Sequence, residues 1–286
     1  MTVDILHDSK ISRLIEQALH EDIGFGDVTS ESIIPEEQLG RAILQAKENG
    51  IVSGSEIVSI VFQYVDSQIT TTVLLDDGGV VAAGQVIAEI HGPIRGILLG
   101  ERVALNFLQR MSGIATLTHK YVHAVAGTTA KISDTRKTAP GLRMLDKKAV
   151  RDGGGVNHRF GLDEMVLIKD NHVAAAGSIA RAVMKSREYL REQNLKAKIE
   201  VETTSEAEVQ EVLKCSGVDR IMLDNFQLDA MRRAVQLINH SVEVEASGGV
   251  SLQTVRAIAE TGVDFISVGA LTHSPKALDI SLELVS

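Results

Sequence analysis

The charged residues that could do chemistry occur in a few short segments of the chain. Arg136 and Lys137 are adjacent in "KISDTRKT", directly after an apolar run. His158 precedes Arg159 in "GVNHRF", and Lys169 follows the apolar run "MVLI". Guanidinium and ammonium groups that gather at one place bind carboxylates or phosphates. The pattern therefore predicts a site for a ligand that carries several negative charges.

Two carboxylates and two glycine turns follow other apolar runs. Glu202 ends "KIEVET" and Asp224 ends "RIMLD", and both can accept hydrogen bonds from sugar hydroxyls or bind a hydrated Mg²⁺. "EASGGV" (245–250) and "SVGAL" (267–271) carry glycines, which let backbone N–H groups approach a phosphate closely. A phosphorylated sugar with an anionic partner molecule fits this set of residues.

All of these residues follow segments that resemble β-strands. From residue 131 onward, short apolar runs alternate with helical segments at intervals of roughly 20–30 residues, which is typical of parallel βα units. In an α/β barrel, the carboxyl ends of the strands form the active-site face. Only six such runs are evident, so we expect an incomplete barrel or a further strand near 150–162; the six runs are 131–135, 165–171, 198–203, 220–226, 242–249 and 264–270.

The first part of the chain has a different periodicity. Residues 10–20 carry apolar residues at helical spacing, and residues 98–125 form one long helical stretch. Between them, short strand-like runs are broken by Gly and Asp, which predicts a small α/β layer. We interpret Asp76 to Gly79 as a hairpin turn. The tail, 276–285, alternates apolar and polar residues like a strand and is expected to pack on this first domain.

Composition narrows the class of protein. The chain has 286 residues and a formal net charge of −9, which argues against nucleic acid as the main partner. Its single cysteine, Cys215, rules out a disulfide within the chain and favours a reducing compartment. The polar N-terminus shows no signal peptide, and no apolar run approaches the ~20 residues of a membrane helix. We expect a cytoplasmic protein without a membrane or nucleic-acid partner.

Other interpretations of the same residues exist. Lys169 alone could form a Schiff base, as in a barrel aldolase or isomerase that acts on a sugar phosphate. The group of cations favours neutralisation of a charged ligand instead. His119 and His123 have helical spacing for a metal, but no third ligand is evident nearby, so a packed or solvated helix face is the simpler interpretation. "GFGDVT" has only two glycines of a dinucleotide fingerprint and no preceding strand.

Several of these segments together resemble one family. They are "EDIGFGDVTS", "GERVALNFLQRMSGIAT", "DTRKTAPGLRMLDKKAVRDGGGVNHRFGLDEMVLIKDNH", "IEVET", "LDNF" and "VEASGGV" with "VGALTHS". They run from residue 21 to 274, and the chain resembles the quinolinate phosphoribosyltransferase family. The resemblance implies an N-terminal α/β sandwich over 1–115, with 276–286 packed on it, and an incomplete, roughly seven-stranded α/β barrel over 116–275. It also implies a homodimer in which the partner subunit lends Arg102 to the site.

The family resemblance also implies a reaction. Phosphoribosyl pyrophosphate and quinolinate react with loss of CO₂ to give nicotinate mononucleotide and pyrophosphate, in de novo NAD biosynthesis. The implied cofactor is Mg²⁺, held by Glu202 and Asp224, and the implied catalytic residues are these two with Lys137 and Lys169. Within "IEVET", Glu202 is chosen over Glu200 as the ribose ligand. The implied substrate-binding residues are Arg102, Thr135, Arg136, Lys137, His158, Arg159, Lys169, His172, Glu202, Asp224, Ser247, Gly248, Gly249, Gly269 and Ala270.

Two other functions are also compatible with the family resemblance. Some relatives of the family are associated with molybdenum transport and only bind an anion. A transferase that uses nicotinate is the other, and it would need fewer cations because its substrate has one carboxylate. The complete set of basic residues favours the quinolinate enzyme over both.

Overall fold

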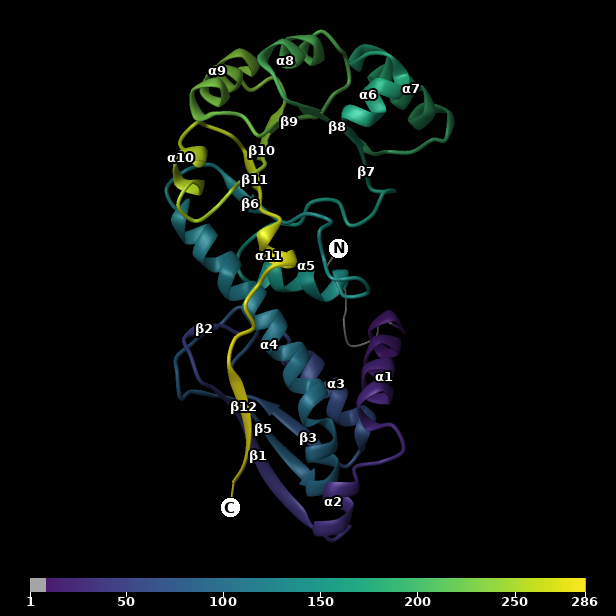
Figure 1. The fold of residues 1–286 in the computed structure, drawn as a ribbon, viewed down its shortest axis with the longest axis vertical. Coiled ribbons are helices and arrows are strands. Elements are labelled where there is room, and N and C mark those ends of the chain that lie inside the picture. The colour runs from purple at the N-terminus through teal and green to yellow at the C-terminus, as the bar shows by residue number, and fades with distance from the viewer. Residues whose placement is uncertain (1–8, 286) are drawn as a thin grey trace. The chain divides into compact units, whose positions relative to one another are not determined.

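The computed structural model describes residues 9–285 of the chain, which divide into two compact units. The first unit contains the chain up to His119, residues 139–154 and the segment from Ser274 onward, and the second contains residues 120–138 and 155–273. The elements of each unit are labelled in Figure 1. Residues 1–8, which carried most of the evidence against a signal peptide, lie outside the described residues.

The first unit is built on a four-stranded antiparallel sheet in the order β12-β1-β5-β3. These strands are β1 (Leu39–Ala46), β3 (Thr70–Val73), β5 (Val86–Pro93) and β12 (Ile280–Val285). The tail strand β12 pairs with β1 from Arg41↔Val285 to Ala46↔Ile280. The helices of this unit are α1 (Ser9–Ile23), α2 (Val28–Ile33), α3 (Ser55–Val65), α5 (Arg143–Asp152) and the greater part of α4 (Ile94–Ala124).

The predicted hairpin turn at Asp76 to Gly79 is wrong. Strand β3 pairs with β5, whereas β4 (Val80–Val81) pairs with β2 (Gly50–Ile51), so the turn does not join two paired strands. The Asp77 carboxylate instead accepts hydrogen bonds from the N–H groups of Gly54 and Ser55 at 3.0 and 2.9 Å. It satisfies free N–H groups at the start of α3.

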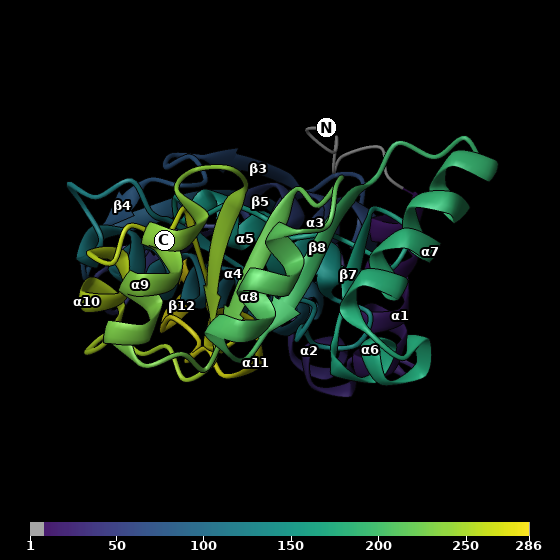
Figure 2. The ribbon, with the colours of Figure 1, turned by 90° about the horizontal axis from the view of Figure 1, so that it is seen from above.

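The second unit is built on a six-stranded parallel sheet in the order β6-β11-β10-β9-β8-β7. All six predicted strands are confirmed, as β6 (Lys131–Ser133), β7 (Met165–Ile168), β8 (Lys198–Thr203), β9 (Arg220–Asp224), β10 (Glu243–Ser247) and β11 (Phe265–Ser267). Helices alternate with the later strands, and they are α6 (Asp170–Ala176), α7 (Ile179–Glu192), α8 (Glu206–Leu213), α9 (Leu228–Ile238), α10 (Val255–Ala259) and α11 (Ala270–His273). Of these, α7 to α10 lie on the outer side of the curved sheet, as Figures 1 and 2 show.

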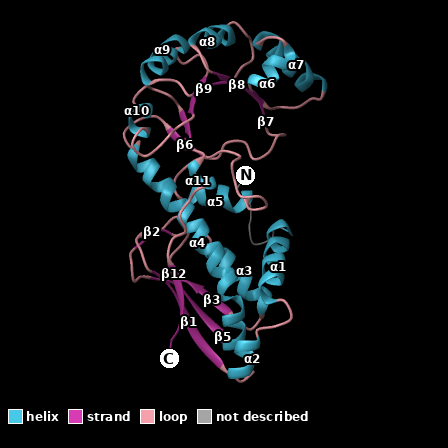
Figure 3. Cartoon of the chain, viewed as in Figure 1, coloured by secondary structure: helices cyan, strands magenta, loops and turns pink. Residues whose placement is uncertain are grey.

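A short bridge extends this sheet beyond β6. Val156 forms a parallel bridge with Ser133, its N–H donates to the Ile132 carbonyl at 2.8 Å, and its carbonyl accepts from the Asp134 N–H at 3.2 Å. The segment in which a further strand was expected therefore pairs with the sheet at a single residue. The fold is the predicted incomplete α/β barrel with a separate antiparallel α/β layer (Figure 3). Across residues 9–285, each helix is too short or too polar to span a lipid bilayer.

Candidate active site

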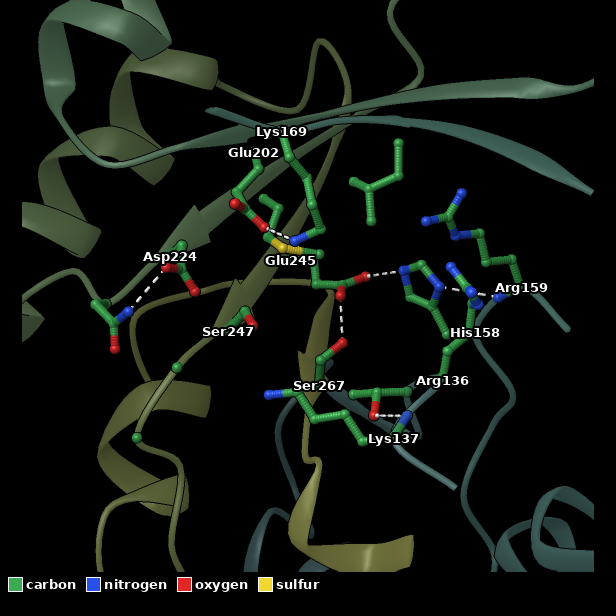
Figure 4. A pocket seen from close by; sticks show the side chains of 16 residues that line it. Arg136, Lys137, His158, Arg159, Lys169, Glu202, Asp224, Glu245, Ser247 and Ser267 are labelled. Atoms are coloured by element: carbon green, nitrogen blue, oxygen red, sulfur yellow. Dashed lines mark hydrogen bonds and ion pairs between the residues drawn. The ribbon is translucent and has the colours of Figure 1, made fainter. Parts of the chain in front are cut away.

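A cavity of about 550 Å³ lies at the carboxyl ends of the strands in the second unit (Figure 4). Parallel strands bring their carboxyl ends to one edge of the sheet, so residues far apart in the sequence meet there. The cavity is lined by Thr135, Arg136, Lys137, His158, Arg159, Leu167, Lys169, Glu202, Met222, Asp224, Asn225, Glu245, Ser247, Gly248, Gly249 and Ser267.

The cations predicted from the sequence line this one cavity. Arg136 and Lys137 follow β6, Arg159 lies in the segment after Val156, and Lys169 follows β7. Burial lowers the pKa of Arg159, and the like charge of Arg136 lowers it further. The two guanidinium groups therefore repel each other, and an anionic ligand would relieve this repulsion. The Arg159 Nη1 donates to the Met165 carbonyl at 2.9 Å, which fixes the side chain.

The carboxylates of Glu202 and Asp224 line the same cavity as these cations. In Figure 4, Arg136 and Arg159 lie on one side of the cavity, and Asp224 and Ser247 lie on the other. Lys169 Nζ forms an ion pair with Glu202 Oε2. An anion that binds to Lys169 must therefore compete with an acidic group that the protein itself supplies.

The turn after β10 has a backbone that only glycine adopts easily. Gly248 and Gly249 have φ angles of +90° and +60°, and a Cβ at Gly248 would lie 2.2 Å from Asn225 Oδ1. Asn225 is itself left-handed, with φ +56°, and its N–H donates to the Ser247 carbonyl at 2.9 Å. Its Nδ2 also donates to Asp224 Oδ2 at 2.8 Å. Asn225 therefore ties the glycine turn to the Asp224 carboxylate.

Four of the predicted substrate-binding residues do not line the cavity. Arg102 lies on α4 in the first unit, with 59% of its side chain exposed and Glu101 at 3.9 Å. His172 accepts a hydrogen bond from the Lys169 N–H through Nδ1 at 2.9 Å, so it supports the start of α6. Gly269 lies beside Lys137, since a Cβ at Gly269 would be 3.1 Å from Lys137 Cδ, and Ala270 begins α11.

Sequence reasoning missed a set of charged residues inside the barrel. Side chains alternate along a strand, so Glu200 points to the same side of β8 as Glu202, and Arg220 to the same side of β9 as Asp224. Inner positions of α/β barrels are usually filled by branched apolar residues. The charges at every second position of "KIEVE" and "VEVEAS" were a visible signal of this exception.

These inner residues form one buried network. His158 Nε2 lies 3.1 Å from Glu200 Oε2 and 3.5 Å from Glu245 Oε2, and both carboxylates are fully buried. Arg220 Nη1 donates to Glu245 Oε2 at 2.8 Å, and Ser267 Oγ donates to Glu245 Oε1. Two acidic residues thus face two basic ones, which makes the burial of their charges tolerable.

The network shifts the pKa of its members. Burial acts to lower the pKa of His158, but hydrogen bonds and charges from Glu200 and Glu245 overcome this effect and raise it to about 9. The Arg159 N–H donates to His158 Nδ1 at 2.9 Å, and protonation of Nδ1 would remove that bond, so this contact offsets part of the rise. Burial raises the pKa of Glu200, because the buried carboxylate is more costly when charged.

The same residues include side chains of the types that bind metal ions. His158, Glu200 and Glu245 offer ligand atoms within 4.8 Å of one another, and no other trio in the described part of the chain does so. A metal ion there would have to displace the Arg220 guanidinium from Glu245 and the proton from His158 Nε2. The contacts therefore describe a closed network of ion pairs and not a metal centre.

Two family models match successive parts of the chain. The model described as "Quinolinate phosphoribosyl transferase, N-terminal domain" matches residues 27–112, and the model described as "Quinolinate phosphoribosyl transferase, C-terminal domain" matches residues 114–283. Together they span most of the chain.

Curated proteins and solved structures agree with the family models. The chain is 45% identical over 275 residues to the "Probable nicotinate-nucleotide pyrophosphorylase [carboxylating]" of Bacillus subtilis, which covers 96% of the chain and 93% of that protein. A chloroplastic Arabidopsis thaliana protein, "Nicotinate-nucleotide pyrophosphorylase [carboxylating]", is 48% identical, and the matched region covers 96% of this chain and 82% of that protein. The crystal structure of NadC from Streptococcus pyogenes superposes with a TM-score of 0.91 at 38% identity, over 97% of this chain and 98% of that one.

Proposed function

The chain belongs to the quinolinate phosphoribosyl transferase family. On this basis we propose which residues of the cavity bind each substrate and which stabilise charge during the reaction. The chain is an enzyme, a pentosyltransferase. It transfers the phosphoribosyl group of phosphoribosyl pyrophosphate to quinolinate. Nicotinate mononucleotide, CO₂ and pyrophosphate are the products, and the mononucleotide enters NAD biosynthesis.

We propose that the basic side of the cavity binds quinolinate. This substrate is a pyridine ring with two adjacent carboxylates, and Arg136, Arg159, Lys137 and Lys169 line the same cavity. The observation that carries the assignment is that Arg136 and Arg159 line one cavity, where burial lowers the pKa of Arg159 and the like charge of Arg136 lowers it further. Orientation of the ring nitrogen toward the sugar is the main contribution of this side, and such positioning is worth up to ~7–11 kcal/mol.

We propose that the side of the cavity that carries Glu202 and Asp224 binds the ribose. The ring nitrogen attacks the anomeric carbon while the bond to pyrophosphate breaks, and positive charge grows on the ribose. Glu202 and Asp224 are placed to hold the ribose hydroxyls and to stabilise that charge. Glu202 lines the cavity while Glu200 is fully buried beneath it, which supports the choice of Glu202 as the ribose ligand. Ser247, Gly248 and Gly249 suit the 5′-phosphate, because their N–H groups can approach it without a side chain in the way.

Loss of CO₂ follows from the first step. Once the nitrogen is bonded to the ribose, the ring carries a positive charge and accepts the electron pair that the departing carboxylate leaves behind. The ring carbon then takes up a proton. We assign no protein base to this step, because the charged ring supplies the electron sink. Lys169, which is paired with Glu202, serves as a cation for the substrate and not as a Schiff-base nucleophile.

We propose that Mg²⁺ acts in the reaction and is shared between the protein and the substrate. Glu202 and Asp224 are hard oxygen ligands on neighbouring strands, which is the kind of donor that Mg²⁺ accepts. These two carboxylates do not form a complete cage, so the phosphates of the substrate would supply further ligands. When bound, the ion neutralises charge on the leaving pyrophosphate.

We also propose a homodimer and a cytoplasmic location. The exposed Arg102 guanidinium on α4 is available to a partner subunit, and it would add a further cation to the partner's quinolinate site. The single cysteine suits a reducing compartment. Sedimentation velocity tests the first proposal, and fractionation of the producing cell tests the second.

The proposed substrate assignment is tested with two acceptors. The purified protein is incubated with phosphoribosyl pyrophosphate, Mg²⁺ and either quinolinate or nicotinate, and the products are identified by mass spectrometry. Nicotinate mononucleotide is expected from quinolinate and at most a trace from nicotinate. Preferred use of nicotinate would contradict the assignment of the basic side to a dicarboxylate.

A further inference from the structure

The buried network raises a question that the proposed reaction does not answer. Glu200 is fully buried and does not line the cavity, so it cannot touch a substrate. Its Oε2 lies 3.1 Å from His158 Nε2, while its Oε1 is buried without a hydrogen-bond partner. An unsatisfied buried acceptor destabilises the fold, and an apolar residue at this position would avoid that cost. The position of Glu200 is therefore better explained by what it does to His158 than by stability.

His158 has a protein group at each ring nitrogen. Nε2 faces Glu200 and Glu245, and Nδ1 accepts the Arg159 N–H at 2.9 Å. The ring therefore presents carbon atoms and not a nitrogen to a ligand in the cavity. Figure 4 shows the same arrangement, with the imidazole between Glu245 and the backbone of Arg159.

The segment that carries Arg159 is held at successive points. The His158 N–H donates to Asp134 Oδ1 at 2.9 Å, the Arg159 N–H donates to the imidazole, and Arg159 Nη1 donates to the Met165 carbonyl at 2.9 Å. The middle contact is the one that depends on the orientation of the imidazole. That orientation is set on the other side of the ring by the inner carboxylates.

We propose that Glu200 is a positioning residue for quinolinate, which acts through the His158 ring to fix the backbone amide of Arg159 and thereby its guanidinium. The inference rests on the proposed function, because it takes the Arg159 side of the cavity as the quinolinate site. It separates the two substrates, since the Glu200 side chain contacts His158 next to Arg159, whereas it is joined to Glu202, the proposed ribose ligand, through the β8 backbone.

The first test compares two charge-removing variants on the same network. Glu200→Gln keeps the shape of the side chain but weakens the hydrogen bond to His158, because a charged acceptor becomes neutral. We expect the KM for quinolinate to rise roughly tenfold and the KM for phosphoribosyl pyrophosphate to change less than about twofold. Glu243→Gln is the matched control. Glu243 also accepts from Arg220, at 2.9 Å, but its side chain is 37% exposed and its second ion pair is with Lys198, so we expect both constants to stay near wild type.

A double-mutant cycle tests whether the effect passes through His158. In a His158→Gln background, Glu200→Gln is expected to raise the KM for quinolinate by less than twofold, because its target is gone. Additive effects of the two substitutions would overturn the proposal. An equal rise in both KM values for Glu200→Gln, or an equal effect of Glu243→Gln, would overturn it as well.

Amide hydrogen exchange gives a readout that does not depend on activity. Exchange is measured above the pKa of His158, where Nδ1 is unprotonated, and there the Arg159 amide is expected to be protected in wild type, since His158 Nδ1 holds it. Glu200→Gln should accelerate exchange at this amide by roughly tenfold, and Glu243→Gln should not. An Arg159 amide that exchanges like a free peptide in wild type would overturn the proposal even if the variants did not fold. Because this experiment needs no substrate, its outcome is separate from a failure of the proposed function, which turnover of the wild-type protein would reveal.

Discussion

At the scale of single residues, the proposed function depends on like charges, those of Arg136 and Arg159, that line one cavity. Burial in this cavity lowers the pKa of Arg159, and repulsion by the like charge of Arg136 lowers it further. A dicarboxylate would convert the repulsion into two sets of charge-assisted hydrogen bonds. Binding of quinolinate should therefore depend strongly on each guanidinium.

Arg136→Ala tests this dependence. The substitution removes a charge-assisted bond, so quinolinate binding measured by calorimetry should weaken by about 1.5–3 kcal/mol. Arg181→Ala, on the exposed face of α7, removes the same charge away from the cavity and serves as control. Unchanged affinity for Arg136→Ala, with a cooperative thermal unfolding transition retained, would show that quinolinate binds elsewhere.

At the scale of elements, the glycine turn after β10 must keep its backbone to meet a phosphate. Gly248→Ala combines a left-handed φ of +90° with a Cβ only 2.2 Å from Asn225 Oδ1, so Asn225 would have to move away from Asp224. We expect the KM for phosphoribosyl pyrophosphate to rise more than about tenfold. Gly127→Ala is the matched control, since Gly127 has a φ of +83° and does not line the cavity, its Cβ would meet nothing within 4 Å, and only the left-handed strain of ~1–2 kcal/mol applies. Equal effects of the two variants would mean that the contact with Asn225 does not matter.

The elements that the sequence predicted well are those with a local signal. The six barrel strands were visible because each is an apolar run followed by polar residues, and the strand ends then placed Arg136, Lys169 and Glu202 at one face. The bridge at Val156 has no such run, since its pairing depends on β6 and not on its own residues. The turn at Asp76 to Gly79 was misread because pairing of β3 with β5 and of β4 with β2 is set at long range.

The inner charges were missed for a different physical reason. A strand buried on both faces is expected to be apolar, so charges at every second position were interpreted only at the strand end. Glu200, Arg220 and Glu245 are tolerable inside because they meet across three neighbouring strands, which no single strand reveals. Likewise, the contact of His158 with Glu200 joins residues 42 apart in the chain.

At the scale of the whole molecule, the buried network links stability to pH. Glu200 and Glu245 raise the pKa of His158 from 6.5 toward about 9, while the Arg159 N–H, which needs an unprotonated Nδ1, offsets part of this rise. The contribution of the protonated ring to stability is therefore fully present below pH ~6.5 and is lost as the pH rises toward about 9. The contribution amounts to at most about 3 kcal/mol. Denaturant unfolding between pH 6 and 9.5 should show a decline in wild type that is absent in His158→Gln. Parallel declines in the two proteins would place the titrating group elsewhere.

The proposed dimer makes a separate prediction at the same scale. Arg102→Ala and Lys169→Ala should each have little activity alone, since each removes a cation from every site. If Arg102 serves the partner's site, mixed dimers contain one site with both residues intact, and an equal mixture that exchanges subunits should recover about a quarter of wild-type activity. No recovery after verified exchange of subunits would show that Arg102 does not act across an interface.

The most direct measurement follows the carbon that leaves. Quinolinate labelled with ¹³C in the carboxyl group next to the ring nitrogen is incubated with the protein, Mg²⁺ and phosphoribosyl pyrophosphate, and labelled CO₂ and nicotinate mononucleotide are quantified together. We predict one labelled CO₂ for each mononucleotide, and no labelled CO₂ when phosphoribosyl pyrophosphate is omitted. A mononucleotide that retains the label, or labelled CO₂ released without the phosphoribosyl donor, would contradict the account.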